Sequence, residues 1–270
     1  MIKAGSIMKA NEDRDGIYGL HAVAAALAAG ELAELWVVPE RHDEARVKAL
    51  VDQAQAMALP VVEIRSGDLA RKVGSDKHQG VGGLLCPLPT LDLPTLLAGL
   101  EGKAPPLFLI LDGVLDPHNL GACLRSAEGA GVTAVLLPKD NACPVNATVR
   151  KVAAGSASRL PVIPVTNLAR TLGLLQEHGF WVVGMAGEGD KSLYELDLRG
   201  PMVMIMGGEE KGLRRLTRAH CDFLAHIPME GRGGSLNVSV ATGICLFEAY
   251  RQRHGVGCGV GTGRFPGEGE

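Results

Sequence analysis

Residues 107–131 read LFLILDGVLDPHNLGACLRSAEGAG and contain the pattern that decides the fold. An apolar run, Leu107–Leu111, is followed by a polar loop, Asp112–Asn119, and then by a helical segment, Leu120–Ala130. The run shows no alternation of apolar and polar residues, which is typical of a strand buried on both faces of a parallel sheet. The stretch therefore predicts a strand–loop–helix unit of an α/β fold.

The same succession of strand, loop and helix continues through the second half of the chain. Continuous apolar runs predict further strands at Ala134–Leu137, Trp181–Met185, Met202–Met206 and Phe223–Ile227. Helical spacing is found at Asn167–His178, Leu213–His220 and Val238–Gln252. We expect an open, doubly wound parallel sheet that binds its ligands at the carboxyl ends of the strands.

A smaller three-layer α/β unit is expected before this sheet. Its predicted elements are a helix at Gly19–Ala29, a strand at Glu34–Val38, a helix at Asp43–Met57, and strands at Pro60–Ile64 and Val81–Cys86. Five prolines between Pro87 and Pro106 indicate a linker, with a short helix at Leu93–Leu100. We therefore expect domains at 15–88 and 105–254, a linker at 89–104 and a Gly-rich, disordered tail at 255–270.

Composition excludes several classes of protein. The formal net charge of −3 shows no general attraction to nucleic acid, so any RNA-binding charge must be local. No apolar run approaches the ~18 residues of a membrane helix, and the polar N-terminus shows no signal peptide, which indicates a cytoplasmic protein without a membrane partner. The six cysteines are scattered without a C-x-x-C pair, which favours reduced thiols over a metal site.

Three polar loops follow three of the predicted strands: Asp112–Asn119, Gly207–Leu213 and Ile227–Asn237. The carboxyl ends of parallel strands share one sheet edge, so these loops can form one pocket. The glycine fingerprints of dinucleotide-binding and P-loop proteins are absent, as is the G-x-S-x-G turn of hydrolases. A dinucleotide-dependent oxidoreductase is therefore disfavoured.

Each loop also has a structural explanation. Asn119 precedes a helix and could be its N-cap, while Ser235 and Asn237 could cap the last helix. Arg125 could be a solvated side chain on its helix. Three such loops on strands of one sheet nevertheless favour a shared functional site.

The loops lie within strings that resemble the three motifs of the SpoU/TrmH class of SPOUT RNA 2′-O-methyltransferases. These strings are LDGVLDPHNLGACLRSAEGAGV (111–132), MIMGGEEKGLRRLT (204–217) and IPMEGRGGSLNVSVATGICLFEAYRQR (227–253). The segments IYGLHAV (17–23) and KHQGVGG (77–83) resemble the family's L30e-like substrate-binding domain. The resemblance implies a C-terminal SPOUT domain with a deep trefoil knot, an N-terminal L30e-like α/β domain, and a homodimer that holds S-adenosylmethionine in the knot.

The resemblance also assigns residues. Those that match the family's catalytic positions are Asn119, Arg125, Glu209, Ser235 and Asn237. Those that match its cofactor-binding positions, which act largely through backbone groups, are Gly207, Ile227 and Leu236. No metal is implied.

Four further residues are candidates for contacts with RNA. His78 and Gln79 could recognise bases or the ribose 2′-hydroxyl, or they could be turn residues beside Gly80. Arg150 and Lys151 belong to a locally basic segment and could bind phosphates, or they could lie on a solvated surface.

The resemblance implies methyl transfer from S-adenosylmethionine to the ribose 2′-hydroxyl of a guanosine in the P loop of 23S rRNA, or of a precursor of the large ribosomal subunit. Arg125 would orient a phosphate or, less favourably, act as a base, because a guanidinium, which stays protonated in proteins, is a poor base. A tRNA substrate and a non-catalytic ribosome-assembly factor are the alternatives.

Overall fold

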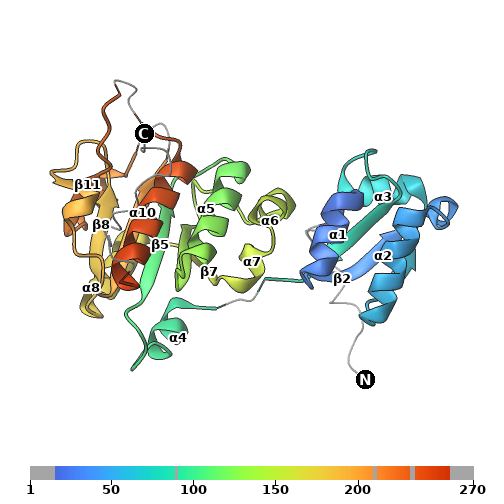
Figure 1. The fold of residues 1–270 in the computed structure, drawn as a ribbon, viewed down its shortest axis with the longest axis horizontal. Helices are drawn as coiled ribbons and strands as arrows, with labels where there is room; N and C mark the ends of the chain where they lie inside the picture. Colours follow the sequence, from blue (N-terminus) through green and yellow to red (C-terminus); the bar gives the residue numbers. More distant parts are fainter. Residues whose placement is uncertain (1–15, 89–90, 209–211, 232–234, 256–270) are drawn as a thin grey trace, which may run out of the picture.

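The computed structural model describes residues 16–88, 91–208, 212–231 and 235–255, which form two α/β units, each with its own sheet. Figure 1 shows the two units side by side along the long axis of the molecule. The predicted Gly-rich tail lies outside the described residues except for Gly255.

The N-terminal unit contains a four-stranded sheet in the order β1-β4-β2-β3, in which β4 is antiparallel to both of its neighbours. Its elements are β1 (Gly16–Tyr18), α1 (Leu20–Ala28), β2 (Leu32–Val37), the 3-10 turn η1 (Pro39–Arg41), α2 (Ala45–Ala56), β3 (Val61–Glu63), α3 (Ser66–Val73) and β4 (Val81–Leu85).

Helices cover both faces of this sheet. Apolar side chains of α1 and α2 pack with Leu35 and Val37 on one face. On the other face, Leu69 of α3 packs with Trp36 and Val38. The alternation along β2 therefore buries side chains in two directions, and the expected three-layer arrangement is confirmed.

The C-terminal unit contains a seven-stranded sheet in the order β7-β6-β5-β10-β8-β11-β9, in which every recorded strand pairing is parallel. Its elements, with the linker helix first, are α4 (Leu93–Ala98), β5 (Leu107–Asp112), α5 (Pro117–Gly129), β6 (Ala134–Pro138), α6 (Ala147–Ala153), α7 (Ser156–Arg159), β7 (Val162–Val165), α8 (Leu168–Glu177), β8 (Trp181–Met185), β9 (Lys191–Ser192), the 3-10 turn η2 (Leu193–Glu195), β10 (Met202–Gly207), α9 (Arg215–Ala219), β11 (Phe223–His226) and α10 (Val238–Arg253).

Buried side chains alternate between the two faces of this sheet. Leu109 of β5 and Met204 of β10 pack with α5 and α10 in one core cluster. Phe108 and Val203 pack with α4 and α8 in the cluster on the opposite face. Each central strand is therefore buried on both sides, which explains the continuous apolar runs and confirms the predicted α/β fold with a parallel sheet.

Polar contacts join the two units where α6 and α7 face α1 (Figure 1). Arg150 Nη1 donates to the carbonyl of Cys86 at 2.6 Å. The hydroxyl of Ser158 donates to Glu31 Oε1 at 2.6 Å. Glu31 and Cys86 are themselves neighbours, because Cys86 N donates to Glu31 O at 2.7 Å. We call this set of four residues the interdomain latch.

In the described part of the chain, no helix is both long enough and apolar enough to cross a membrane. Five cysteines lie within this part, at positions 86, 123, 143, 221 and 245, and all of them are free thiols.

Candidate functional site

The three predicted loops meet at the carboxyl edge of the large sheet. β5 and β10 are paired neighbours, so their last residues, Asp112 and Gly207, lie side by side. β8 separates β10 from β11, the strand that leads into the third loop. The sheet topology therefore brings three segments that are far apart in sequence to one place.

Asn119 and Asn237 form a direct link between the first and third loops. The side-chain nitrogen of Asn237 donates to the side-chain oxygen of Asn119 at 3.0 Å. The oxygen of Asn237 accepts from the backbone N–H of Ser239 at 2.9 Å and from its hydroxyl at 2.6 Å, which caps α10. Asn237 is therefore both a helix cap and a contact of the site.

Asn119 is not the N-cap of its helix. That position belongs to Asp116, whose Oδ2 accepts from the backbone N–H of Asn119 at 2.9 Å. The cap frees the Asn119 side chain for its contact with Asn237, so the capping explanation of Asn119 is wrong.

Two glycines allow the second loop to pack against its neighbours. A Cβ on Gly208 would lie 2.5 Å from the carbonyl oxygen of Gly113, and one on Gly207 would lie 2.3 Å from the carbonyl carbon of Gly212. Gly212 N donates to Gly208 O at 2.9 Å and closes the loop. Glu209 follows Gly208 and lies outside the described residues, so its catalytic role stays a prediction.

A cavity of about 320 Å³ opens between the second and third loops and the turn that follows β8, and no residue of the first loop lines it. Four of the predicted residues line it: Gly207, Ile227, Ser235 and Leu236. The volume lies in the range of small-molecule pockets, and the walls are mainly glycines and apolar side chains. Close backbone approach at the glycines and apolar walls suit a nucleoside-containing ligand such as S-adenosylmethionine.

Asp112 connects the first loop to the helix that follows the second. It is 1% exposed, and its Oδ2 accepts from the hydroxyl of Thr217 at 2.7 Å. Arg214 Nε lies 2.9 Å from Asp112 Oδ1 as an ion pair, although its N–H is not aimed at that oxygen. The carboxylate thus holds α9 against the end of β5, a contact that the sequence pattern did not reveal.

Arg125 does not line the cavity. It is exposed on α5 and makes no hydrogen bond or ion pair with any residue that the structure describes. It lies four residues before Gly129, hence on the same helix face, and a Cβ on Gly129 would lie 3.8 Å from the ring of Phe247. Arg125 therefore borders the outer surface formed by α5 and α10.

The N-terminal candidates for RNA contact are engaged in local structure. His78 is buried, and its Nδ1 accepts from the backbone N–H of Gly80 at 3.0 Å. Gln79 Oε1 accepts from the backbone N–H of Leu20 at 3.0 Å, which satisfies a free donor at the start of α1. These contacts favour the turn explanation over the recognition of bases.

Arg150 and Lys151 are adjacent in the sequence but differ sharply in solvent exposure. Arg150 is 3% exposed and belongs to the interdomain latch, so in this arrangement its guanidinium is not available to a phosphate. Lys151 is exposed to solvent on the same helix. Burial, which the sequence cannot distinguish for two adjacent cations, separates their roles.

Glu188 and Arg218 are further charged residues of the cavity. Sequence reasoning gave Glu188 no role and counted Arg218 only among the basic residues beside the second motif that could bind RNA. The two form an ion pair on the lining of the cavity, and the hydrogen bond from Arg218 lowers the pKa of the Glu188 carboxyl. The available signal was the predicted strand Trp181–Met185, because the polar residues that follow a parallel strand lie at the same edge.

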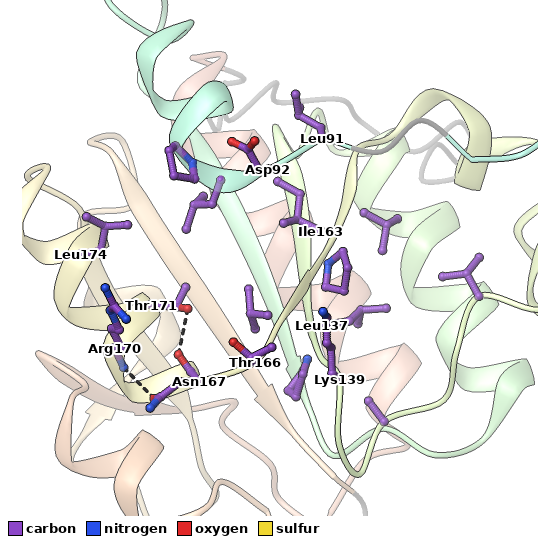
Figure 2. Close-up of a pocket in the computed structure, with 18 of the residues that line it drawn as sticks. Leu91, Asp92, Leu137, Lys139, Ile163, Thr166, Asn167, Arg170, Thr171 and Leu174 are labelled. Atoms are coloured by element: carbon purple, nitrogen blue, oxygen red, sulfur yellow. Dashed lines mark hydrogen bonds between the residues drawn. The ribbon is translucent and has the colours of Figure 1, made fainter.

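A larger cavity, of about 1490 Å³, lies away from this site between α4, the ends of β6 and β7, and α8. Figure 2 shows Lys139, Asn167 and Arg170 at its polar end and leucines and Ile163 along its walls. None of the residues predicted for the functional site lines it. We therefore place the functional site in the smaller cavity, despite the difference in size.

Within the described ranges, no group of three or more His, Cys, Asp or Glu side chains is arranged to hold a metal ion. Burial raises the pKa of Cys245 to about 12 and that of Cys221 to about 11. Neither thiol is therefore activated as a nucleophile.

The fold and the site define a methyltransferase-type α/β protein, and comparison with known families agrees: the chain belongs to the SpoU rRNA methylase family, whose model matches residues 106–247. A second model, described as RNA 2′-O ribose methyltransferase substrate binding, matches residues 17–89.

Individual proteins are similar over most of the chain. The 23S rRNA (guanosine-2′-O-)-methyltransferase RlmB of Pseudomonas aeruginosa is 53% identical over 242 residues, which cover 88% of this chain and 96% of that protein. An AdoMet-bound rRNA methyltransferase from Sinorhizobium meliloti is 27% identical, with a TM-score of 0.65. The match covers 88% of this chain and 87% of that chain. The SpoU methyltransferase AviRb of Streptomyces viridochromogenes, at 23% identity and a TM-score of 0.72, covers 88% of this chain and 90% of its own, and shares the fold.

Proposed function

We propose that this protein transfers a methyl group from S-adenosylmethionine to the ribose 2′-hydroxyl of a guanosine in 23S rRNA. The observation that carries the proposal is the convergence of the second and third motif loops on one cavity, with the Asn119–Asn237 hydrogen bond joining the first loop to the third. The 53% identical relative named as a 23S rRNA (guanosine-2′-O-)-methyltransferase supports the choice of substrate.

The residues around the cavity suggest a division of labour. Bound S-adenosylmethionine supplies a methyl group on a positively charged sulfur. Backbone groups at Gly207, Ile227 and Leu236 hold the cofactor, while Ser235 and the linked Asn119 and Asn237 orient the ribose hydroxyl beside it. Good positioning of two reacting groups can contribute up to ~7–11 kcal/mol in favourable cases.

Arg125 and Glu209 complete the proposed catalytic set. A guanidinium is a poor base, so Arg125 acts by binding a phosphate of the RNA rather than by taking the proton, which the 2′-hydroxyl loses to water as the methyl group is transferred. Exposure of Arg125 outside the cavity supports this role. Replacing Arg125 with Ala should abolish methyl transfer and leave cofactor affinity unchanged; more than about a tenth of the wild-type rate, a loss of only ~1.4 kcal/mol in the barrier, would contradict the assignment.

We extend the proposal to the architecture of the family. The C-terminal domain, 105–254, would contain the deep trefoil knot, and the N-terminal domain, 15–88, would be an L30e-like domain that binds the RNA substrate. The linker would be 89–104. Family membership over 106–247 and the substrate-binding match over 17–89 support this division.

We also propose a homodimer. Val240 and Phe247 of α10 are two helical turns apart and about half exposed, at 51% and 49%. Two large apolar side chains on one helix face favour burial against a second copy of the chain. Because Arg125 borders this surface, dimer formation would place it at the interface.

The proposed target is a guanosine of the P loop in 23S rRNA, on a precursor of the large ribosomal subunit in the cytoplasm. Lys151 contacts RNA phosphates, whereas His78, Gln79 and Arg150 shape the RNA-binding surface through their structural contacts. Family resemblance supports the target, and the exposure of Lys151 supports its role.

The test uses the full chain with methyl-labelled S-adenosylmethionine and, in separate reactions, 23S rRNA or tRNA. We expect label in 23S rRNA and measurable heat of cofactor binding by calorimetry. Label in tRNA alone would favour the tRNA alternative. Absence of any heat of cofactor binding would favour a non-catalytic RNA-binding factor.

A further inference from the structure

The proposed cofactor cavity has one ion pair on its lining, between Glu188 and Arg218. Among the described residues that line it, Glu188 and Arg218 are the one Asp or Glu and the one Lys or Arg, and they form an ion pair. His226 is the one further titratable side chain of the described lining. The other lining side chains are apolar or belong to glycine and serine, so the charged pair is a distinct feature of the cavity.

The loop that carries Glu188 is held in place by β11. Gly189 N donates to the carbonyl of Ala186 at 2.9 Å, and His226 Nδ1 donates to the carbonyl of Gly189 at 2.9 Å. A Cβ on Gly189 would lie 2.7 Å from the backbone of Ala225, so loop and strand are in close contact. These contacts fix the backbone on which the Glu188 side chain is carried.

Arg218 is positioned from the opposite side. It belongs to α9, whose Thr217 donates to the buried carboxylate of Asp112 at 2.7 Å. Arg218 N also donates to the carbonyl of Arg214 at 2.9 Å. The backbone segments that carry both members of the pair are therefore held by contacts that do not depend on a ligand, which lowers the entropy lost on binding.

We propose that Glu188 and Arg218 bind the α-amino and α-carboxylate groups at the methionine end of S-adenosylmethionine. The inference rests on the proposed function and names the residues that recognise one end of the cofactor. The Arg218 guanidinium donates to the carboxylate, and the Glu188 carboxylate accepts from the ammonium group. Each charge of the pair keeps a partner of opposite sign when the ligand enters, and the apolar remainder of the cavity receives the adenosine.

The test compares two ligands that differ only at this end. S-adenosylhomocysteine has the amino acid group, whereas 5′-methylthioadenosine keeps the adenosine and sulfur but lacks it. Calorimetric titrations of the full chain should show at least a tenfold loss of S-adenosylhomocysteine affinity, or about 1.4 kcal/mol, in Glu188→Gln and in Arg218→Gln. The affinity for 5′-methylthioadenosine should stay within twofold of wild type.

Two further variants sharpen the comparison. Arg218→Lys keeps the positive charge and should recover part of the lost affinity. Arg199→Gln breaks an exposed ion pair with Asp197, outside the residues that line the cavity, and should change neither affinity. If Arg218→Gln does not fold, Glu188→Gln decides the matter, because Glu188 is 64% exposed on a loop.

Equal losses for both ligands, or no loss for either, would overturn this inference while leaving the proposed function intact. If the wild-type chain binds neither ligand nor S-adenosylmethionine, the proposed function fails and the inference fails with it.

Discussion

Asn237 uses the two ends of one amide group for different tasks. Its oxygen caps α10 through Ser239, and its nitrogen donates to Asn119. Asp is as good an N-cap as Asn, but it offers no N–H, so a carboxylate oxygen would face the oxygen of Asn119. We expect Asn237→Asp to lower the methyl-transfer rate at least tenfold, which corresponds to ~1.4 kcal/mol in the barrier, with little change in melting temperature.

Single-turnover rates and thermal melts of the same preparation check this prediction. Asn237→Ala, which removes both the cap and the donor, is the comparison and should lose stability as well as rate. A fully active Asn237→Asp protein would show that Asn237 is only a helix cap.

The site residues that could be predicted from the sequence are mainly those that follow predicted strands. The adjacency of Asn119 and Asn237 follows from two loops at one sheet edge, and that shared edge was predictable from the sequence. Glu188 also follows a predicted strand, Trp181–Met185, but one acid between two glycines matches no functional motif, so its position gave no role. Its importance arises from pairing with Arg218, thirty residues later, which only the fold reveals.

At the scale of elements, the turn after β10 depends on close packing of its backbone against the turn after β5. We expect Gly208→Ala to displace the second motif loop, because its Cβ would meet a backbone oxygen that cannot rotate away. The predicted result is at least a tenfold loss of S-adenosylmethionine affinity by calorimetry, with the far-ultraviolet circular dichroism spectrum retained.

Gly173→Ala is the matched control. Gly173 lies inside α8, and no heavy atom outside its own helical turn lies within 4 Å of the point that a Cβ would occupy. Alanine should therefore stabilise the helix by ~0.5–1 kcal/mol. Wild-type cofactor affinity in Gly208→Ala would mean that the loop does not shape the cavity.

A second element-scale contact joins α5 to α7. Glu128 accepts hydrogen bonds from Arg159 Nε at 2.6 Å and from the hydroxyl of Ser156 at 2.9 Å. The hydrogen bond from Arg159 lowers the pKa of the Glu128 carboxyl. A lowered pKa contributes stability above the unfolded-state pKa of ~4.3 and loses it as the pH falls through the folded-state value.

The melting temperature of wild type should therefore exceed that of Glu128→Gln near neutral pH, and the gap should close as the pH falls below ~4.3. Thermal melts of both proteins across this range provide the measurement. A gap that stays constant with pH would show that the ionised carboxylate contributes nothing.

The elements that escaped prediction share physical causes. β7 contains Pro164. Proline argues against the prediction of a strand, but it is tolerated here because β7 is an edge strand. α6 and α7 are short and are separated by Ala154 and Gly155 in left-handed conformations, so neither provides a full period of apolar residues. β1 has three residues, α3 has eight and β9 has two, which is too few for a reliable pattern.

At the scale of the molecule, the interdomain latch determines how the two α/β units are joined. Five prolines marked the linker in the sequence, but nothing there distinguished Arg150, the buried member of the latch, from an ordinary surface cation. We expect Arg150→Met to release the N-terminal unit, because it removes the donor to the carbonyl of Cys86. RNA affinity should fall severalfold while cofactor affinity persists, and limited proteolysis should cut the linker faster.

Lys151→Met is the control on the adjacent residue. It should weaken RNA binding through a lost phosphate contact without changing the rate of linker cleavage. If Arg150→Met alters neither linker cleavage nor RNA affinity, the latch does not hold the units together.

The most direct test of the whole account is to locate the methyl group. The full chain is incubated with 23S rRNA and methyl-labelled S-adenosylmethionine, and the RNA is then digested and the modified nucleotide mapped by mass spectrometry. We predict a single 2′-O-methylguanosine in the P loop of 23S rRNA, formed at least tenfold more slowly by Asn237→Asp. Methylation on a base, on a ribose other than that of guanosine, or only in tRNA would contradict the account.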